Sequence, residues 1–306
     1  CTNFISVSIP DCVTSIGSGA FSGTIYYSEK SNWVNGILYI SNHLIAAKET
    51  IFGSCAIKEG TRCIADYAFK DCTNLTSITI PNSLTAIGTY SFGSCSGLTE
   101  ITIPNNVTSI GDNAFERCTG LVSISIPSSV KNIGASAFYS CTGLTSITIS
   151  GNVERIGRYA FSDTVYYNEK SNWVNGVFYI GNHLIAAKES IFGGCVVNDG
   201  TTCIADYAFW GCTNLTSIMI PSSVTSIGTG ALWRTGLTNI SVGKENPVYH
   251  SQNNCLIDTK SKILIVGCST STIPTDGSVT SIAYGAFATC VNLIKIKIPS
   301  GVTNIG

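Results

Sequence analysis

The chain repeats a 23-residue pattern along most of its length. The unit CTNLTSITIPNSLTAIGTYSFGS begins at Cys72, and the following units begin at Cys95, Cys118 and Cys141. The same unit occupies residues 1–23, 141–163 and 212–234 and restarts at Cys290, while two divergent copies, 49–71 and 189–211, have Glu in the Cys position. A period of this length is typical of a solenoid, in which each repeat forms one coil that stacks on its neighbours. The sequence therefore predicts a stack of about twelve coils.

Within one unit the order of residues predicts the shape of the coil. In LTSITIP, Leu75, Ile78 and Ile80 point inward, and the alternation predicts a short strand with Ser77 and Thr79 on its outer face. Proline ends this strand, because it has no N–H to donate to a neighbouring strand. A second extended piece, LTAIG, follows, and NAFERC places Ala114, Phe115 and Cys118 on one side of a short helical turn.

Three longer units, 24–48, 164–188 and 235–289, interrupt the regular ones. Residues 24–72 and 164–212 are identical at 35 of 49 positions, an offset of 140 residues that predicts a duplication of block 1–140 as block 141–280. GILYISNHLIAA and GVFYIGNHLIAA predict hairpins with the two-residue turns Ser41-Asn42 and Gly181-Asn182, and CLIDTKSKILIV predicts a third hairpin.

The phrase CTNLTSITIPxSVTSIGxxAFxxC, nearly intact at 72–95, 118–141 and 212–231, resembles the BspA-type leucine-rich repeat of bacterial and protozoan surface proteins. The resemblance implies a single leucine-rich repeat solenoid over residues 1–306, mostly β, with about twelve coils, one parallel strand ladder and short helical turns. It also implies an exported, extracellular or cell-surface location and an adhesive role, but no family-wide ligand residues. Because the chain ends in mid-repeat, we expect it to be a fragment of a longer chain.

Composition argues against several classes of function. Only 11% of residues are charged and the net charge is −1, which offers no basic patch for nucleic acid. No apolar run approaches the roughly 20 residues that span a bilayer, so we expect no membrane insertion within this sequence. The three histidines include one duplicated pair, His43 and His183, and neither HExxH nor GxSxG occurs. We therefore expect a non-catalytic protein without a cofactor or a metal ion.

The fourteen cysteines allow three interpretations. One cysteine per coil, in one column beside the Ala-Phe pair, favours a ladder of buried thiols. The alternative for an exported protein is disulfides, for which Cys55 with Cys63 and Cys195 with Cys203 are the best candidates. The absence of CxxC pairs makes zinc the least favoured interpretation.

Two surfaces are candidates for binding. The first is the outer face of the strand row, a polar strip formed by Ser77, Thr79, Glu100, Thr102, Ser123, Ser125, Ser146 and Thr148. The second is the aromatic set of the two similar long units, Tyr26, Tyr27, Trp33, Tyr39, Tyr166, Tyr167, Trp173 and Tyr179. The alternative is that hydroxyl residues merely suit exposed strands and that the aromatics form a local core.

The leading functional hypothesis is an adhesin-like protein that recognises a host or cell-surface protein, or a glycan, through its solenoid face. The alternatives are a passive spacer or stalk in a larger surface protein, and a glycan-binding accessory module with paired exposed rings. We also expect self-association through uncapped ends, because a terminal coil leaves an apolar face and an unpaired strand open.

Overall fold

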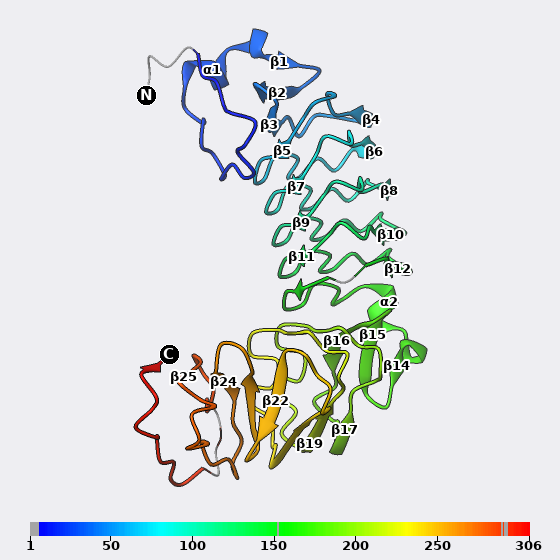
Figure 1. Cartoon of the computed structure of the whole chain (residues 1–306). Helices are drawn as coiled ribbons and strands as arrows, with labels where there is room; N and C mark the ends of the chain where they lie inside the picture. Colours follow the sequence, from blue (N-terminus) through cyan, green and yellow to red (C-terminus); the bar gives the residue numbers. More distant parts are fainter. Residues whose placement is uncertain (1–5, 152, 289, 291–292) are drawn as a thin grey trace. The chain divides into compact units, whose positions relative to one another are not determined.

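The computed structural model describes residues 6–151, 153–288, 290 and 293–306 of the chain (Figure 1). The chain divides into two compact units, residues 1–172 and 173–306, and the boundary falls in the sequence of the long unit 164–188. Each unit is a stack of coils built mostly from short strands, which confirms the predicted solenoid class. The single solenoid over residues 1–306, the duplicated blocks and self-association through the ends stay predictions.

Unit 1 contains two short α-helices, two 3₁₀ helices and thirteen strands among its described residues. The helices are α1 (Ile25–Ser28), η1 (Lys30–Asn32), α2 (Val165–Asn168) and η2 (Lys170–Asn172). The largest sheet runs in the order β1 (Trp33–Val34), β2 (Ile37–Ile40), β3 (His43–Ala47), β5 (Cys63–Ile64), β7 (Ala86–Ile87), β9 (Ser109–Ile110), β11 (Asn132–Ile133) and β13 (Arg155–Ile156). A second row contains β4 (Gly53–Ala56), β6 (Leu75–Thr79) and β8 (Glu100–Ile101), and then the pair β10 (Ser123–Ile126) and β12 (Ser146–Ile149).

Unit 2 has the same two kinds of row. One sheet runs in the order β14 (Trp173–Val174), β15 (Val177–Ile180), β16 (His183–Ala187), β18 (Cys203–Ile204) and β20 (Ser226–Ile227). The other row is β17 (Gly193–Val196), β19 (Leu215–Ile220) and β21 (Asn239–Val242). A further sheet contains β22 (Tyr249–Gln252), β23 (Cys255–Asp258), β24 (Ile263–Val266), β25 (Ser281–Ile282) and β26 (Asn304–Ile305).

The expected single strand ladder is two parallel rows in each of the two units. The LTSITI segments form one row, in which Ile78 pairs with Ile101, and the second extended segments form another, in which Ile87 pairs with Ile110. The row of β5, β7 and β9 is the more continuous, because the β2–β3 hairpin joins it, with His43 opposite Cys63. The three predicted hairpins are present, and Ser41 and Gly181 have the positive φ values, 52° and 56°, that tight hairpin turns require.

The expected helical turn at the Ala-Phe segments is not helical. In the coil of Phe115, N–H groups bond to carbonyls three residues earlier, as from Glu116 to Asn113 and from Cys118 to Phe115. Two left-handed residues, Asn113 with φ 56° and Arg117 with φ 58°, flank the apolar pair. A helix cannot continue through a left-handed residue. The segment is therefore a pair of tight turns, whereas the short helices lie in the long units.

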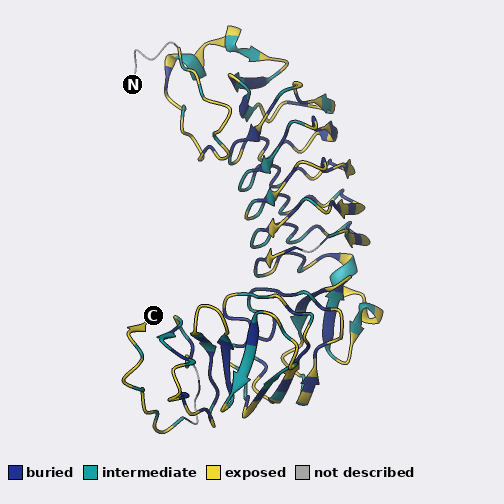
Figure 2. Ribbon diagram, viewed as in Figure 1, coloured by how far each residue is buried: buried dark blue, intermediate teal, exposed yellow. Residues whose placement is uncertain are grey.

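Stacked phenylalanines fill the core of unit 1. Phe69, Phe92, Phe115, Phe138 and Phe161 are fully buried, and successive rings lie 5.1 to 5.4 Å apart and nearly parallel. The backbone N–H groups of the first four of these residues donate to the next coil, as from Phe92 to the carbonyl of Ala114 at 2.8 Å. Buried residues accordingly line the inside of the coils and exposed ones the outside (Figure 2).

A ladder of buried thiols runs beside the phenylalanines, as the sequence predicts. Cys72, Cys95, Cys118 and Cys141 are fully buried, and the Cys118 thiol donates to the carbonyl of Phe92 at 3.1 Å. All thirteen described cysteines are free, Cys55, Cys63, Cys195 and Cys203 included, and Cys1 lies outside the described residues. Burial raises the pKa of Cys72 from the ordinary value of 9.0 to about 12 and also raises that of Cys118.

We expect Phe115→Ala to lower the free energy of unfolding by about 3–5 kcal/mol, because it removes a ring packed between two others and leaves a cavity. Chemical denaturation followed by circular dichroism measures the change. The exposed Ser125→Ala is the control, with an expected effect within about 0.5 kcal/mol. Equal stabilities of the two variants would contradict the stacked core.

The ladder thiols should not react with a thiol reagent in native buffer, even at pH 9. Thiolate is the reactive form, and a pKa raised to about 12 at Cys72 keeps that thiol protonated at this pH. The exposed Cys12 is the internal control and should react first. Mass spectrometry of labelled peptides, with and without denaturant, tests this; rapid native labelling of Cys95 or Cys118 would contradict the buried ladder.

Candidate functional site

The polar strip predicted on the strand row is present in unit 1. Ser77 stands opposite Glu100, and Ser123 and Ser125 stand opposite Ser146 and Thr148 on the paired strands. Of the eight predicted residues, Ser77 is half-buried and the other seven are exposed. The strip contains neither an aromatic ring nor an arginine, the side chains that most often anchor protein interfaces. It is a uniform polar surface.

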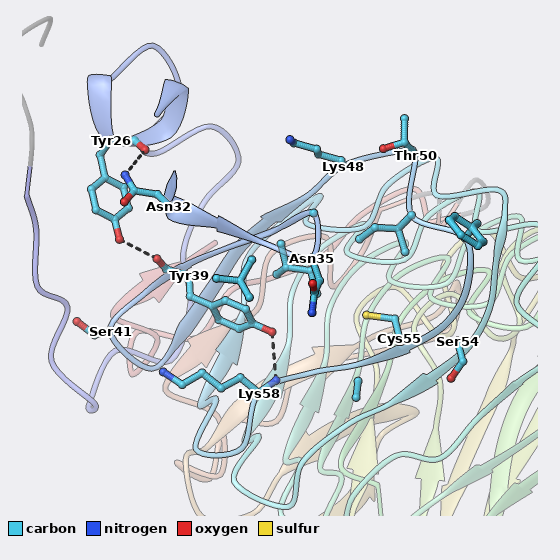
Figure 3. Close-up of a pocket in the computed structure, with 16 residues that line it drawn as sticks. Tyr26, Asn32, Asn35, Tyr39, Ser41, Lys48, Thr50, Ser54, Cys55 and Lys58 are labelled. Carbon is cyan, nitrogen blue, oxygen red and sulfur yellow. Dashed lines mark hydrogen bonds between the residues drawn. The ribbon is translucent and has the colours of Figure 1, made fainter. Parts of the chain in front are cut away.

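The aromatic residues of the first long unit hold that unit together. The Trp33 indole N–H donates to the carbonyl of Tyr27 at 2.8 Å, and the two rings meet edge to face at 5.3 Å. The Tyr26 hydroxyl donates to the carbonyl of Tyr39 at 3.0 Å (Figure 3). All four aromatics are half-buried. The local-core interpretation therefore accounts for these side chains.

The corresponding residues of the second long unit, Tyr166, Tyr167, Trp173 and Tyr179, are half-buried as well. Tyr166 and Tyr167 belong to unit 1, and Trp173 and Tyr179 to unit 2. The Tyr179 hydroxyl accepts a hydrogen bond from the N–H of Asn198 at 3.3 Å, and the Trp173 ring stacks on Phe178 at 5.3 Å.

A groove opens beside the first aromatic set, between the β1–β2 turn and the segment that contains β4 (Figure 3). We call it the first groove. It has a volume of about 1090 Å³, and its lining includes Val34, Ile37 and Tyr39 on one side and residues 50–52 and 54–56 on the other. The second groove, in unit 2, has a volume of about 720 Å³ and is lined by the residues 140 positions later, among them Val174, Tyr179 and Phe192.

Phe52 lines the first groove with 80% of its surface exposed. By repeat position it occupies the column of Leu75, which is fully buried. The pairing of β4 with β6 explains why Phe52 is not buried. Gly53, rather than Phe52, is paired with Leu75, and a bulge follows. Gly53 adopts φ +70°, a conformation that glycine tolerates, and Ile51 is buried instead. The slip of one position turns the phenylalanine outward.

The second groove repeats this arrangement. Phe192 is 84% exposed, Gly193 has φ +76°, and the same bulge lies between β17 and β19. Val34 and Val174 are also exposed, at 61% and 56%. Sequence reasoning missed all four of these side chains. The available signal was the Phe-Gly pair in both divergent coils, where regular coils such as 72–94 and 95–117 have Leu-Thr.

The charged side chains that line the first groove are Lys48 and Lys58. The Lys48 ammonium lies 5.1 Å from the centre of the Trp33 ring, and Lys188 lies 4.9 Å from Trp173 in the second groove. Burial raises the pKa of the Cys55 thiol and of the Tyr39 hydroxyl, so both are neutral at pH 7. The groove thus combines apolar walls with a positive rim and offers no activated nucleophile, an arrangement suited to binding.

The remaining chemical groups add no reactive cluster to the described residues. His43 and His183 are buried at the two hairpins, and His43 Nε2 lies 3.2 Å from the carbonyl oxygen of Val13. Within the described ranges no group of three or more His, Cys, Asp or Glu is placed to hold a metal ion. Among the same residues, no helix has the length and apolar character needed to cross a bilayer.

The family profile described as "BspA type Leucine rich repeat region" matches residues 1–61, 62–192 and 188–306 in six copies. The chain belongs to this family. No match was found among curated proteins.

Among solved structures, the chain is similar to a leucine-rich repeat protein from Eubacterium ventriosum, with 22% identity and a TM-score of 0.36 over 90% of this chain. It spans 60% of the length of that protein. A leucine-rich repeat protein from Bacteroides ovatus is 22% identical, with a TM-score of 0.34 over 99% of this chain and 83% of the other. A leucine rich cell surface protein from Faecalibacterium prausnitzii is also 22% identical, with a TM-score of 0.35 and coverages of 99% and 87%.

We expect Trp33 and Phe52 to respond differently to truncation. Trp33→Ala should lower the free energy of unfolding by about 2–3 kcal/mol, less than for a fully buried ring, because the indole is half-buried and hydrogen-bonded. Phe52→Ala should change it by no more than about 0.5 kcal/mol, because its ring is exposed. Denaturation curves of the two variants test this; a large loss with Phe52→Ala would identify a core residue.

Proposed function

We propose that this protein is a non-catalytic, exported or cell-surface binding protein that recognises a host or cell-surface protein through the first and second grooves. The observation that carries the proposal is the exposure of Phe52 and Phe192, at 80% and 84%, on equivalent groove walls. Burying such a ring contributes about 1.5–3 kcal/mol, so a chain that turns it outward twice leaves that free energy available to a partner.

The positive rim supports a role in recognition. Lys48 and Lys188 are exposed and face the same groove walls as the phenylalanines. Such charges increase the association rate and restrict the choice of partner, while the apolar contact supplies affinity. Family membership supports the surface location, because the BspA-type resemblance implies exported proteins.

The two alternatives are less well supported. A passive stalk needs no exposed phenylalanine, so this role does not explain the Phe-Gly pair and the bulge that occur in both units. A glycan module needs free aromatic faces, and the exposed tyrosines are partly covered. Tyr67 stacks on Tyr90 at 5.2 Å, Arg158 lies 4.3 Å over the ring of Tyr159, and Tyr284 contacts Trp233 at 5.8 Å.

The proposal is tested with the double variant Phe52→Ala/Phe192→Ala. Binding of the purified chain to intact cells and to immobilised extracellular proteins is measured by titration. We expect the variant to bind about 30-fold more weakly, the loss expected of a hot-spot residue. Ser125→Ala, on the polar strip, is the control and should bind as the wild type does. A double variant with unchanged affinity would refute the assignment.

A further inference from the structure

One wall of the first groove is the free edge of a sheet. β4 pairs with β6 on one side only, and among the described residues no strand pairs with its other side. Ser54, Cys55 and Ala56 of this strand line the groove. β17 is likewise the edge strand of its sheet, and Gly194, Cys195 and Val196 line the second groove.

The hydrogen bonds around β4 show which backbone groups face the groove. The N–H of Ile57 donates to Thr79 at 3.0 Å, toward β6, whereas the N–H of Lys58 donates to the Tyr39 hydroxyl at 3.1 Å, across the groove (Figure 3). Neighbouring residues of a strand direct their backbone groups to opposite sides. Ser54 and Ala56 therefore have the orientation of Lys58, and their N–H and C=O groups point into the groove.

The second groove has the same geometry. The N–H of Val197 donates to Met219 at 3.0 Å, toward β19, and the N–H of Asn198 donates to the Tyr179 hydroxyl at 3.3 Å. Gly194 and Val196 accordingly face the groove. In both units a tyrosine hydroxyl occupies one position of the hydrogen-bond row that an additional strand would form.

The edge is free because the long unit contributes its strands elsewhere. The β2–β3 hairpin joins the other row through β5, so the row of β4, β6 and β8 receives no strand from residues 24–48. Proteins commonly protect such an edge with charged residues or proline. Ser54, Cys55 and Ala56 provide neither, and a peptide strand can approach them.

We propose that each groove accepts an extended peptide segment of the partner protein as an added β-strand. This inference rests on the proposed function and defines its ligand. The backbone of the peptide bonds to Ser54 and Ala56, an apolar side chain packs against Phe52 and Val34, and flanking carboxylates meet Lys48 and Lys58. The acidic preference follows from charge complementarity, because the charged residues that line the first groove are both lysines.

The probe is a displayed library of random linear peptides, selected on the whole chain. We expect the enriched peptides to combine an aromatic or aliphatic residue with Asp or Glu on either side. An enriched peptide is then synthesised in two N-methylated forms. One form carries the methyl groups on every second backbone amide, and the other form carries them on the remaining amides. Only the amides on one edge of an added strand can bond to β4. The form methylated on that edge should therefore lose at least about tenfold in affinity, and the other form should bind normally.

The matched protein variant is Ala56→Pro combined with Val196→Pro. Proline removes the N–H that faces each groove, while the bonds to β6 and β19 come from the neighbouring residues. We expect about a tenfold loss of peptide affinity. The control, Ala56→Thr with Val196→Thr, keeps both N–H groups and should bind as the wild type does. Denaturation curves establish that both variants are folded.

The outcomes separate this inference from the proposed function. If both methylated forms and the proline variant bind normally while Phe52→Ala/Phe192→Ala does not, the grooves recognise side chains and the added strand is wrong. If the phenylalanine variant also binds its cellular partner normally, the proposed function fails. Enrichment of basic peptides would overturn the acidic ligand, and a dimer that the proline variant abolishes would identify a second copy as the occupant.

Discussion

The fold depends on contacts between neighbouring coils, because a single coil cannot satisfy its own backbone. The phenylalanine rings repeat every 5.1 to 5.4 Å, close to the roughly 4.8 Å between hydrogen-bonded strands, so ring stacking and backbone bonding share one spacing. Each ladder thiol also donates to a carbonyl of the preceding coil, as Cys95 does to Phe69 at 3.1 Å. A regular coil is thereby held on both sides and has little freedom to form a site.

The long units are where this constraint is relaxed. In unit 1 the hairpin β2–β3 extends the row that contains β5 and adds no strand to the row of β4, β6 and β8. The stack therefore stays connected through β5, while β4 has a strand on one side only. The same departure leaves room for the groove, which Lys48 and Lys58 line. The interruption of the stack therefore provides the groove and its free edge, and the bulge between β4 and β6 adds the exposed ring of Phe52.

The sequence predicted the stack of coils well, because the same residue types recur at equivalent positions of the 23-residue units. Phe115 and Cys118 lie inside, the thiols are free, and the hairpins turn at Ser41 and Gly181, all as the pattern indicates. The sequence pattern did not predict the exposure of Phe52. The position in the repeat determines whether a side chain points into or out of the coil only where the strand register is regular. A bulge at Gly53 shifts the register by one residue, and in a strand one residue reverses the side chain. The second row was missed because its strands in the regular coils, such as β7 and β9, span only two residues, which is too short for an alternation to show in the sequence.

The two copies preserve some groove residues and change others. Phe52 and Phe192, Val34 and Val174, and Lys48 and Lys188 are identical at equivalent positions, while Ile37 becomes Val177. The edge strand changes more, since SCAIK at 54–58 becomes GCVVN at 194–198, with four of five residues changed. A site that read the side chains of β4 would differ between the copies. A site that uses the backbone of β4 is not affected by these side-chain changes, because every residue other than proline offers the same N–H and C=O groups. The replacement of Lys58 by Asn198 removes one cation from the second groove, which makes it the less selective of the two for an acidic strand.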